Sequence, residues 1–301
     1  MRQPPLPAAQ PRSSSWLAFA PALFVLLWST GFVGAKYGLP YAPPLTFLAI
    51  RLVIVAVLLL LWALARRERW PASWIEVGHI AVVGVLLHGV YLGAVYLAFA
   101  WGLEAGTSAV IVSIQPLLVA ALAGPLLQER VTGRQWLGLV LGLVGVTVVV
   151  WRKAGLSAES FHAALLCLVA LFAITAALLY QKRSLAAMPL VAGNCLQFAA
   201  AAVVLVIAAL LFEDWRHIAW NWRFVFAMTW LVLVLSIGAV GLLLLLIRRG
   251  AATRVASLFF LVPPTVTLMA WPLMGETLSW AELAGMLLVM FGVALVNRAK
   301  T

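Results

Sequence analysis

One arginine, Arg51, lies deep inside a long apolar stretch of this 301-residue sequence. If the stretch is a helix that begins at Pro43, Arg51 lies about 12 Å along it, too deep for easy access to water. All nine acidic residues fall in loops or in the first turn of a helix, so none lies in the same layer to pair with it. An unpaired charge at that depth needs backbone carbonyls or a bound anion. We therefore consider two roles: binding a substrate carboxylate through two parallel hydrogen bonds, or a structural arginine satisfied by carbonyls.

His88 is a second ionisable side chain at this depth, about 18 Å along its helix from Glu76. A histidine there could pass a proton, because its pKa is ordinarily near neutral, or it could be a hydrogen-bonded residue of a cavity. Other deep aromatic and neutral polar side chains could stack on a substrate or bind it, although each is also compatible with helix packing. The candidate substrate-binding residues are Trp28, Ser29, Arg51, His88, Tyr91, Trp101, Gln115, Thr175 and Trp230.

The sequence contains no pattern typical of a metal site. Cys167 and Cys195, the two cysteines, lie in separate apolar segments and have no further Cys or His at metal-ligand spacing. Histidines and acids do not cluster as a polytopic membrane enzyme would require. We therefore predict no metal, no cofactor, no catalytic residue and no enzymatic activity.

The elements that must position these residues follow from the composition. The chain is 65% hydrophobic and 10% charged, whereas soluble domains carry about 25% charged residues. Lipid is therefore its expected surrounding, and helices satisfy their own backbone hydrogen bonds there. Residues 1–15, rich in proline and serine, are expected to form a disordered tail. The predicted membrane spans are 16–37, 43–65, 76–101, 104–126, 133–151, 162–182, 189–211, 223–247, 251–273 and 280–297.

The net charge of +11 reflects topology rather than nucleic-acid binding. If the N-terminus is cytoplasmic, 14 of the 20 lysines and arginines fall in cytoplasmic segments. Positive residues concentrate on that side of a membrane protein. We therefore predict that both termini are cytoplasmic.

An internal duplication organises the ten spans. Residues 105–149 align without a gap on residues 252–296, and identical columns include two prolines, two glycines and a glutamate. We predict one repeat over 16–155 and a second over 156–301. Because each holds five helices, an odd number, the second enters the membrane in the opposite orientation. The predicted fold is thus all-α and integral to the membrane, with two five-helix inverted repeats around a central cavity.

The repeated residues have structural interpretations of their own. Glu129 and Glu276 each precede a capping box, Thr132 with Gln135 and Ser279 with Glu282, and lie near the positive end of the following helix. A coupling role in transport is the alternative. Pro116 and Pro263 are candidate hinges, or static kinks that serve packing. Glycines of the fifth and tenth spans favour close helix contact.

Several segments resemble the drug/metabolite transporter superfamily in its EamA branch of ten-helix exporters. They are WSTGFVGAKYGL (28–39), FLAIRL around Arg51, IQPLL around Pro116, and the segments GPLLQE and WPLMGE, with which equivalent spans of the two repeats end. Within that branch the chain is most similar to bacterial exporters of the YddG type. The resemblance implies export of aromatic and other neutral amino acids across the bacterial inner membrane.

We therefore expect an exporter of small neutral or zwitterionic metabolites that works by alternating access. Facilitated diffusion is favoured because no carboxylate lies at the midplane, and proton coupling through His88 is the second choice. A sugar-phosphate or nucleotide-sugar carrier would need several deep lysines or arginines, whereas Arg51 is alone at that depth. A channel would show rings of charge or carbonyl filters, and neither is evident. The oligomeric state, the exact substrates and the direction of net flux stay open.

Overall fold

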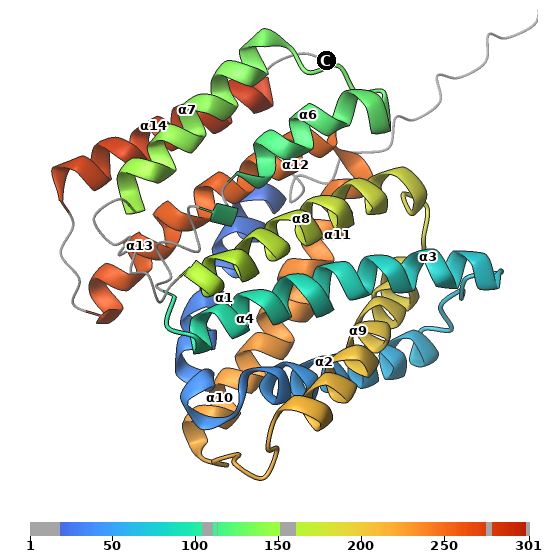
Figure 1. Ribbon diagram of the computed structural model, residues 1–301. Coiled ribbons are helices and arrows are strands. Elements are labelled where there is room, and N and C mark those ends of the chain that lie inside the picture. The colour runs from blue at the N-terminus through green and yellow to red at the C-terminus, as the bar shows by residue number, and fades with distance from the viewer. Residues whose placement is uncertain (1–18, 104–110, 113, 151–160, 275–278, 299–301) are drawn as a thin grey trace, which may run out of the picture.

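The computed structural model describes residues 19–103, 111–112, 114–150, 161–274 and 279–298, and every regular element among them is a helix (Figure 1). The first half contains α1 (Ala20–Gly38), η2 (Leu39–Tyr41), α2 (Pro44–Ala65), α3 (Trp74–Gly84), η3 (Val85–Val90), α4 (Tyr91–Ala100), α6 (Gln115–Leu127) and α7 (Gly133–Val150). The second half contains α8 (Phe161–Ser184), α9 (Leu190–Phe212), α10 (Trp222–Trp230), η6 (Leu231–Ala239), α11 (Val240–Arg249), α12 (Ala252–Ser257), η7 (Leu258–Leu261), α13 (Val262–Met274) and α14 (Trp280–Arg298). The segments η3 and η6 are π-helical, and each joins two α-helices into one continuous span.

The described helices confirm the all-helical membrane fold. Five segments are long and apolar enough to cross a membrane: Pro44–Ala65, Trp74–Ala100, His162–Ser184, Leu190–Phe212 and Trp222–Arg249. Five shorter apolar helices lie where the sequence predicts the other spans: Ala20–Gly31, Gln115–Leu127, Gly133–Val148, Ala252–Val266 and Leu283–Arg298. The predicted tail at residues 1–15 lies outside the described residues.

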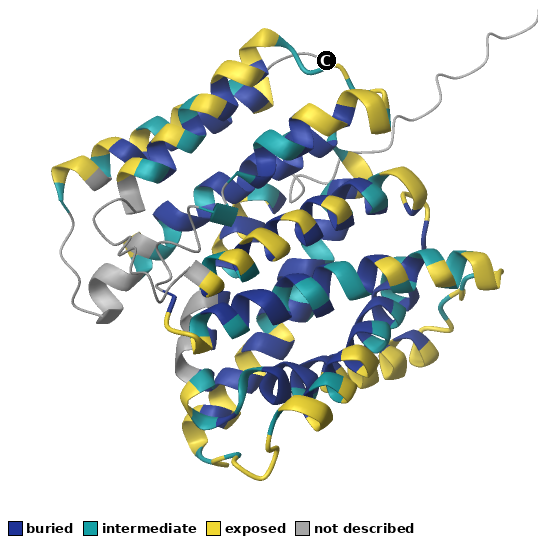
Figure 2. Cartoon of the chain, in the orientation of Figure 1, coloured by how far each residue is buried: buried dark blue, intermediate teal, exposed yellow. Residues whose placement is uncertain are grey.

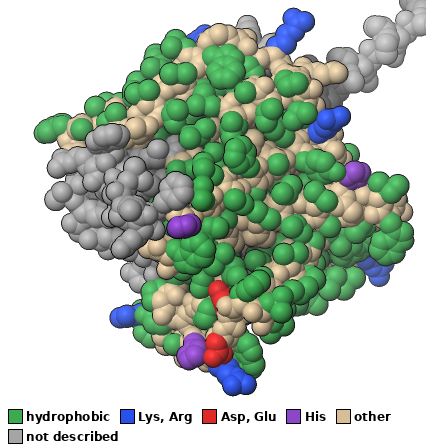
Figure 3. Space-filling view, viewed as in Figure 1, with side chains coloured by type: hydrophobic (Ala, Val, Ile, Leu, Met, Phe, Trp, Pro, Cys, Tyr) green, Lys and Arg blue, Asp and Glu red, His purple; other side chains and the backbone are tan. Residues whose placement is uncertain are grey.

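The molecular surface has the character expected of a protein in lipid. Hydrophobic side chains are spread over the whole described face in Figure 3, and the lysines and arginines lie near its edges. Large apolar side chains such as Phe172, Val203 and Leu210 are exposed, while the inner faces of their helices are buried (Figure 2). A water-soluble protein would not expose apolar helix faces on this scale. The exposed faces are therefore the ones that contact acyl chains.

Contact between α7 and α14 shows that the two repeats are inverted. The helices lie side by side (Figure 1), and a Cβ added at Gly138 would lie 2.5 Å from the Gly292 carbonyl oxygen. Likewise, a Cβ at Gly145 would lie 2.7 Å from the Gly285 oxygen. Gly138 corresponds to Gly285, and Gly145 to Gly292, in the sequence repeat. An exchange of equivalent partners is the mark of a two-fold axis, and the antiparallel pairing gives equivalent helices opposite directions.

The other helices also pack in equivalent pairs, each helix of one repeat against helices of the other. The first helix of repeat one, α1, packs on α10 and η6 of repeat two, and α8 packs on α4 and η3 of repeat one. The second helices, α2 and α9, pack on each other. The π-helical segments repeat as well, because residues 85–90 shifted by 147 positions fall at 232–237, inside η6. The duplication therefore extends through the third helix of each half, beyond the stretch that the sequence alignment covers.

Candidate functional site

The two π-helical segments and the helices that face them form the candidate site. A π-helical turn adds a residue to the helix, and such turns are frequent at functional sites. The second helix of each repeat faces the π-helical segment of the other: α2 contacts η6, and α9 contacts η3. Arg51 makes the first contact, and Phe198 makes the second. Both contacts therefore lie between the two halves.

Arg51 is held by hydroxyl groups rather than by carbonyls or a carboxylate. Its side chain is 1% exposed. Its Nε and Nη2 both donate to Ser236 Oγ, at 3.0 and 2.8 Å, and its Nη1 donates to Tyr96 Oη at 3.3 Å. Within the described residues, no carboxylate forms a salt bridge with it. Arg51 is thus a buried cation whose described partners are all neutral, which favours an anionic ligand in its surroundings.

His88 is buried against an aromatic ring. It stacks on Phe198 with ring centroids 4.0 Å apart and an interplanar angle of 14°. Among the residues that the structure describes, its Nε2 has no hydrogen-bond partner. Tyr91 is also buried, one turn further along the same span. His88 and Tyr91 are therefore both buried on the span that contains η3.

The neutral polar candidates fall into two groups. Ser29 and Thr175 donate to the carbonyl oxygens of Val25 and Leu171, four residues earlier in their own helices. Such bonds satisfy a hydroxyl in an apolar surrounding. Gln115 differs, because it is fully buried and neither polar atom of its side-chain amide has a partner among the described residues. A buried unpaired amide is costly, so Gln115 is the stronger candidate for contact with a ligand.

The three tryptophan candidates are spread over the molecule. Trp28 is 8% exposed and packs against Phe24 and Phe259, with ring centroids 5.3 Å from each. Trp230 is 37% exposed and donates from Nε1 to Thr30 Oγ1 at 3.0 Å. Trp101 follows the end of α4 and is 56% exposed. The contacts of Arg51 and His88 within the described residues include neither Trp101 nor Trp230.

The two candidate hinge prolines lie at helix starts rather than inside unbroken helices. Pro116 is in the first turn of α6, directly after a turn at Ile114. Pro263 is the second residue of α13 and follows the 3-10 segment η7. A proline at the first turn of a helix leaves no hydrogen bond broken, so neither proline need kink its helix. In both repeats the α-helix is interrupted just before the proline, and this interruption is the feature that the repeats share.

In the first repeat, the capping box predicted after Glu129 is present, and the Glu129 carboxylate has a partner that the sequence did not indicate. Thr132 N donates to Gln135 Oε1 at 2.9 Å, and Gln135 N donates to Thr132 Oγ1 at 3.3 Å, which is the predicted capping box. The Glu129 carboxylate accepts instead from Ala252 N, in the opposite repeat. Glu276 lies outside the described residues.

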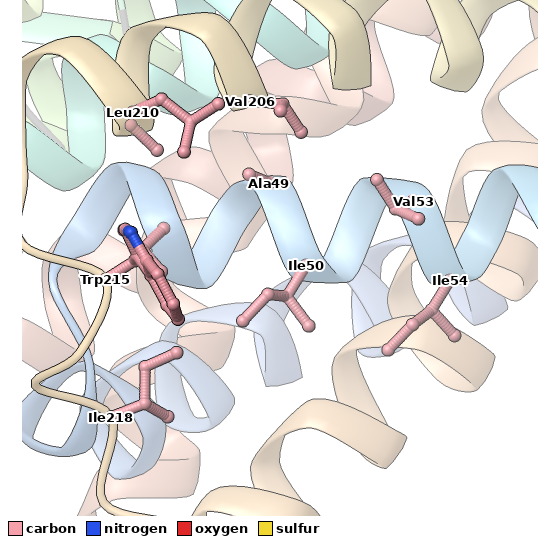
Figure 4. A pocket seen from close by; sticks show the side chains of 10 residues that line it. Ala49, Ile50, Val53, Ile54, Val206, Leu210, Trp215 and Ile218 are labelled. Atoms are coloured by element: carbon pink, nitrogen blue, oxygen red, sulfur yellow. The ribbon is translucent and has the colours of Figure 1, made fainter.

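A cavity of about 330 Å³ lies between α2 and α9 (Figure 4), and exposed apolar residues such as Val53 and Leu210 are part of its lining. Apolar side chains of both helices line it, and the Trp215 ring stands near one end. Thr46 is its polar residue, and that hydroxyl donates to Glu213. This cavity suits hydrocarbon rather than a charged metabolite. A central cavity between the two halves remains a prediction.

Three residues of the site are absent from the sequence-based candidates: Tyr96, Phe198 and Ser236. Each lies in an apolar helix, where a single hydroxyl or aromatic ring is indistinguishable from ordinary packing. One signal for Ser236 was available, because it is a polar residue within the apolar run LVLVLSIGA. Its role becomes evident only from its two bonds to Arg51, which is 185 positions away.

Comparisons with known proteins agree with this architecture. The model of the EamA-like transporter family matches residues 14–151 and again residues 162–298. A Bacillus subtilis protein named "Uncharacterized transporter YvbV" is 29% identical, over 92% of this chain and 90% of its own. A Salmonella typhimurium protein named "Probable amino-acid metabolite efflux pump" is 26% identical, over 91% and 92%. The Escherichia coli protein named "Uncharacterized inner membrane transporter YedA" is 27% identical, over 93% and 89%. One solved structure, at 20% identity, covers 95% of this chain and 97% of its own with a TM-score of 0.79, so it shares the fold.

Fold, inverted repeats and relatives together define an integral membrane transporter. The chain belongs to the EamA-like transporter family, and both halves match its model.

Proposed function

We propose that this transporter exports amino acids, aromatic and other neutral ones, from the cytoplasm across a bacterial inner membrane. The observation that carries the proposal is Arg51, a buried guanidinium whose described partners are neutral hydroxyls. A substrate carboxylate can take the place of the Ser236 hydroxyl and accept two parallel hydrogen bonds from Nε and Nη2. The name of the Salmonella relative supports the same substrate class.

Alternating access is the proposed mechanism. Arg51 and Ser236 belong to different repeats, so a ligand that replaces their bond acts at the boundary between the two halves. Rocking of one inverted repeat against the other would then expose that ligand to each face in turn. Both termini are proposed to be cytoplasmic, as the distribution of lysine and arginine predicts.

Transport is proposed to be facilitative. Proton-coupled carriers usually place Asp, Glu or His where a proton must be carried through the membrane. The described carboxylates are Glu68, Glu76, Glu129, Glu213 and Asp214, all at or beyond helix ends. Proton coupling through His88 is the second candidate, and it is favoured by the Nε2 atom, which has no partner within the described part of the chain.

Reconstituted liposomes test the proposal. We expect saturable uptake of labelled phenylalanine without a pH gradient, and competition by other neutral amino acids but not by amines that lack the carboxylate. Uptake that occurs only with a proton gradient would favour the role of His88. Transport of a sugar phosphate in place of every amino acid would contradict the substrate class.

A further inference from the structure

The carboxylate of Glu129 joins the two repeats at one end of the transporter. Glu129 follows α6 of repeat one, and both of its carboxylate oxygens lie 3.1 Å from the Ala252 amide nitrogen. Ala252 is buried and is the first residue of α12 in repeat two. Because α6 and α12 pack side by side (Figure 1), the bond spans the contact between the fourth helix of one repeat and its counterpart.

Lys182 binds the turn between α11 and α12, the turn that leads to Ala252. Its Nζ donates to the carbonyl oxygens of Ile247 and Gly250, at 3.1 and 2.6 Å, where α11 ends. A cation at the C-terminus of one helix and an anion at the N-terminus of the next both match the helix dipoles. The hydrogen bonds of Lys182 lie within repeat two, because Lys182 belongs to the same repeat as the turn. The hydrogen bond to Glu129 instead connects the turn to repeat one.

We propose that Glu129 is a latch that keeps the two repeats together at this end, which the charge distribution predicts to be cytoplasmic, and that it must release Ala252 before this end can open. The proposal rests on the transport function but not on which substrate is carried. Alternating access requires the halves to separate at one face at a time, and a bond that crosses between them at that face opposes the separation.

The chemistry of the bond suits a reversible latch. A hydrogen bond from a backbone N–H to a carboxylate is stronger than one between neutral groups, so it holds the closed state. When the end opens, water can solvate both the carboxylate and the amide, so the broken bond leaves no buried polar group unpaired. A buried apolar contact alone would give a seal without this directional bond.

A second glutamate provides a matched control at the opposite end. Glu213 follows α9 of repeat two and accepts from Leu45 N and Thr46 N of repeat one, at 2.9 and 2.7 Å. The 28-residue span Trp222–Arg249 separates its loop from the turn that Glu129 holds. Glu213 therefore repeats the chemistry of the latch, a carboxylate on the start of a helix from the other repeat, at a distant place.

The experiment measures how fast a cysteine at a buried position next to Ala252 reacts with a water-soluble maleimide. Thr253 follows Ala252 and is 2% exposed. Thr253→Cys is prepared in a chain with Cys167→Ala and Cys195→Ala, and is reconstituted in nanodiscs so that both faces meet the reagent. We expect Glu129→Ala to raise the labelling rate at least about tenfold, the factor for one hydrogen bond to a charged group.

Ala252→Pro breaks the same bond from the other side. It removes only the N–H donor, and proline suits both the first position of a helix and the extended backbone of Ala251. We expect it to raise labelling as Glu129→Ala does, with no further increase when the two are combined. Glu213→Ala and Thr132→Ala should leave labelling unchanged, since neither touches Ala252.

Unchanged labelling in both folded latch variants would overturn the proposal. An equal increase in Glu213→Ala would do so too, because it would show general loosening. If neither Glu129→Ala nor Ala252→Pro gives folded protein, the glutamate serves folding and the latch is rejected. Because no substrate is used, failure of the latch leaves the proposed amino-acid transport standing, and the reverse holds as well.

Discussion

The contact of α2 with η6 and the contact of α9 with η3 lie at related places in the two repeats, yet their chemistry differs. The first joins a guanidinium to the hydroxyl group of Ser236, and the second stacks an imidazole on a phenyl ring. In an inverted repeat such paired positions line the same boundary from opposite directions. The duplication therefore produced two contacts of similar geometry, one in each repeat. Their sequences then diverged, so that the α2–η6 contact contains a charge and the α9–η3 contact contains aromatic rings.

This difference suits a ligand with two unlike ends. A carboxylate can bind at Arg51, while an apolar or aromatic side chain can lie against the rings at the other contact. A symmetric pair of cations would instead favour a doubly charged ligand such as a phosphate ester. The contrast predicts that changes at the aromatic contact act mainly on stability, and changes at Arg51 mainly on transport.

Phe198→Ala is expected to have the largest effect, and on stability. Phe198 is fully buried and carries the stack with His88. Its truncation should lower the free energy of unfolding by about 3–5 kcal/mol, measured by thermal unfolding of the purified protein. Phe198→Leu is the control and should cost less than about 1.5 kcal/mol. A loss in Phe198→Ala as small as that in Phe198→Leu would contradict the expectation that the ring fills the core there.

Arg51→Leu is expected to lower amino-acid uptake about a hundredfold with little loss of folded protein. It removes the charge-assisted hydrogen bonds that we propose Arg51 donates to the substrate carboxylate. Arg51→Lys keeps the charge but lacks the planar fork, so it should retain part of the uptake. Initial uptake rates in liposomes, at equal amounts of folded protein, measure both. Uptake at the original rate in Arg51→Leu would place the arginine outside the substrate path.

Ser236→Ala is expected to tighten apparent substrate binding about fivefold, because it leaves buried guanidinium donors unsatisfied until a carboxylate arrives. The KM for uptake measures this change. Thr175→Ala is the control, since that hydroxyl bonds its own helix, and its KM should not change. A structural arginine would give the opposite result for Ser236→Ala, namely lower stability with an unchanged KM.

His88→Gln is expected to have the smallest effect. Under facilitative transport it should change uptake by no more than about twofold and leave it insensitive to a pH gradient, because no proton is carried. Uptake with and without an imposed gradient measures this. Loss of gradient-driven accumulation in the variant, with accumulation present in the original protein, would assign proton coupling to His88.

Much of the fold could be predicted from sequence because lipid imposes a local rule. A span must be long, apolar and helical, and that pattern is readable over about 20 residues. Glycines at equivalent positions predicted a close helix contact for the fifth and tenth spans, and the structure shows that these two helices, α7 and α14, pack on each other. Duplication also fixed the relative direction of the halves, since five helices is an odd number.

The site was less predictable because its partners are far apart in the chain. Arg51 is identifiable as a deep charge, but Ser236 and Tyr96 become its partners only when η6 and α4 pack against α2. Glu129 was assigned to the start of the following helix, whereas its carboxylate bonds Ala252, 123 positions away. The spacing of residues along the chain identifies capping residues between consecutive helices. It carries no information on hydrogen bonds between residues of different repeats.

The central claim is that a substrate carboxylate binds at Arg51 in the boundary between two inverted repeats. The most direct measurement compares uptake of labelled phenylalanine and of phenethylamine, which lacks the carboxylate, in liposomes with the original protein and with Arg51→Leu. We expect uptake of phenylalanine only, and its loss in the variant. Equal uptake of both compounds, or the same phenylalanine uptake in both proteins, would contradict the account.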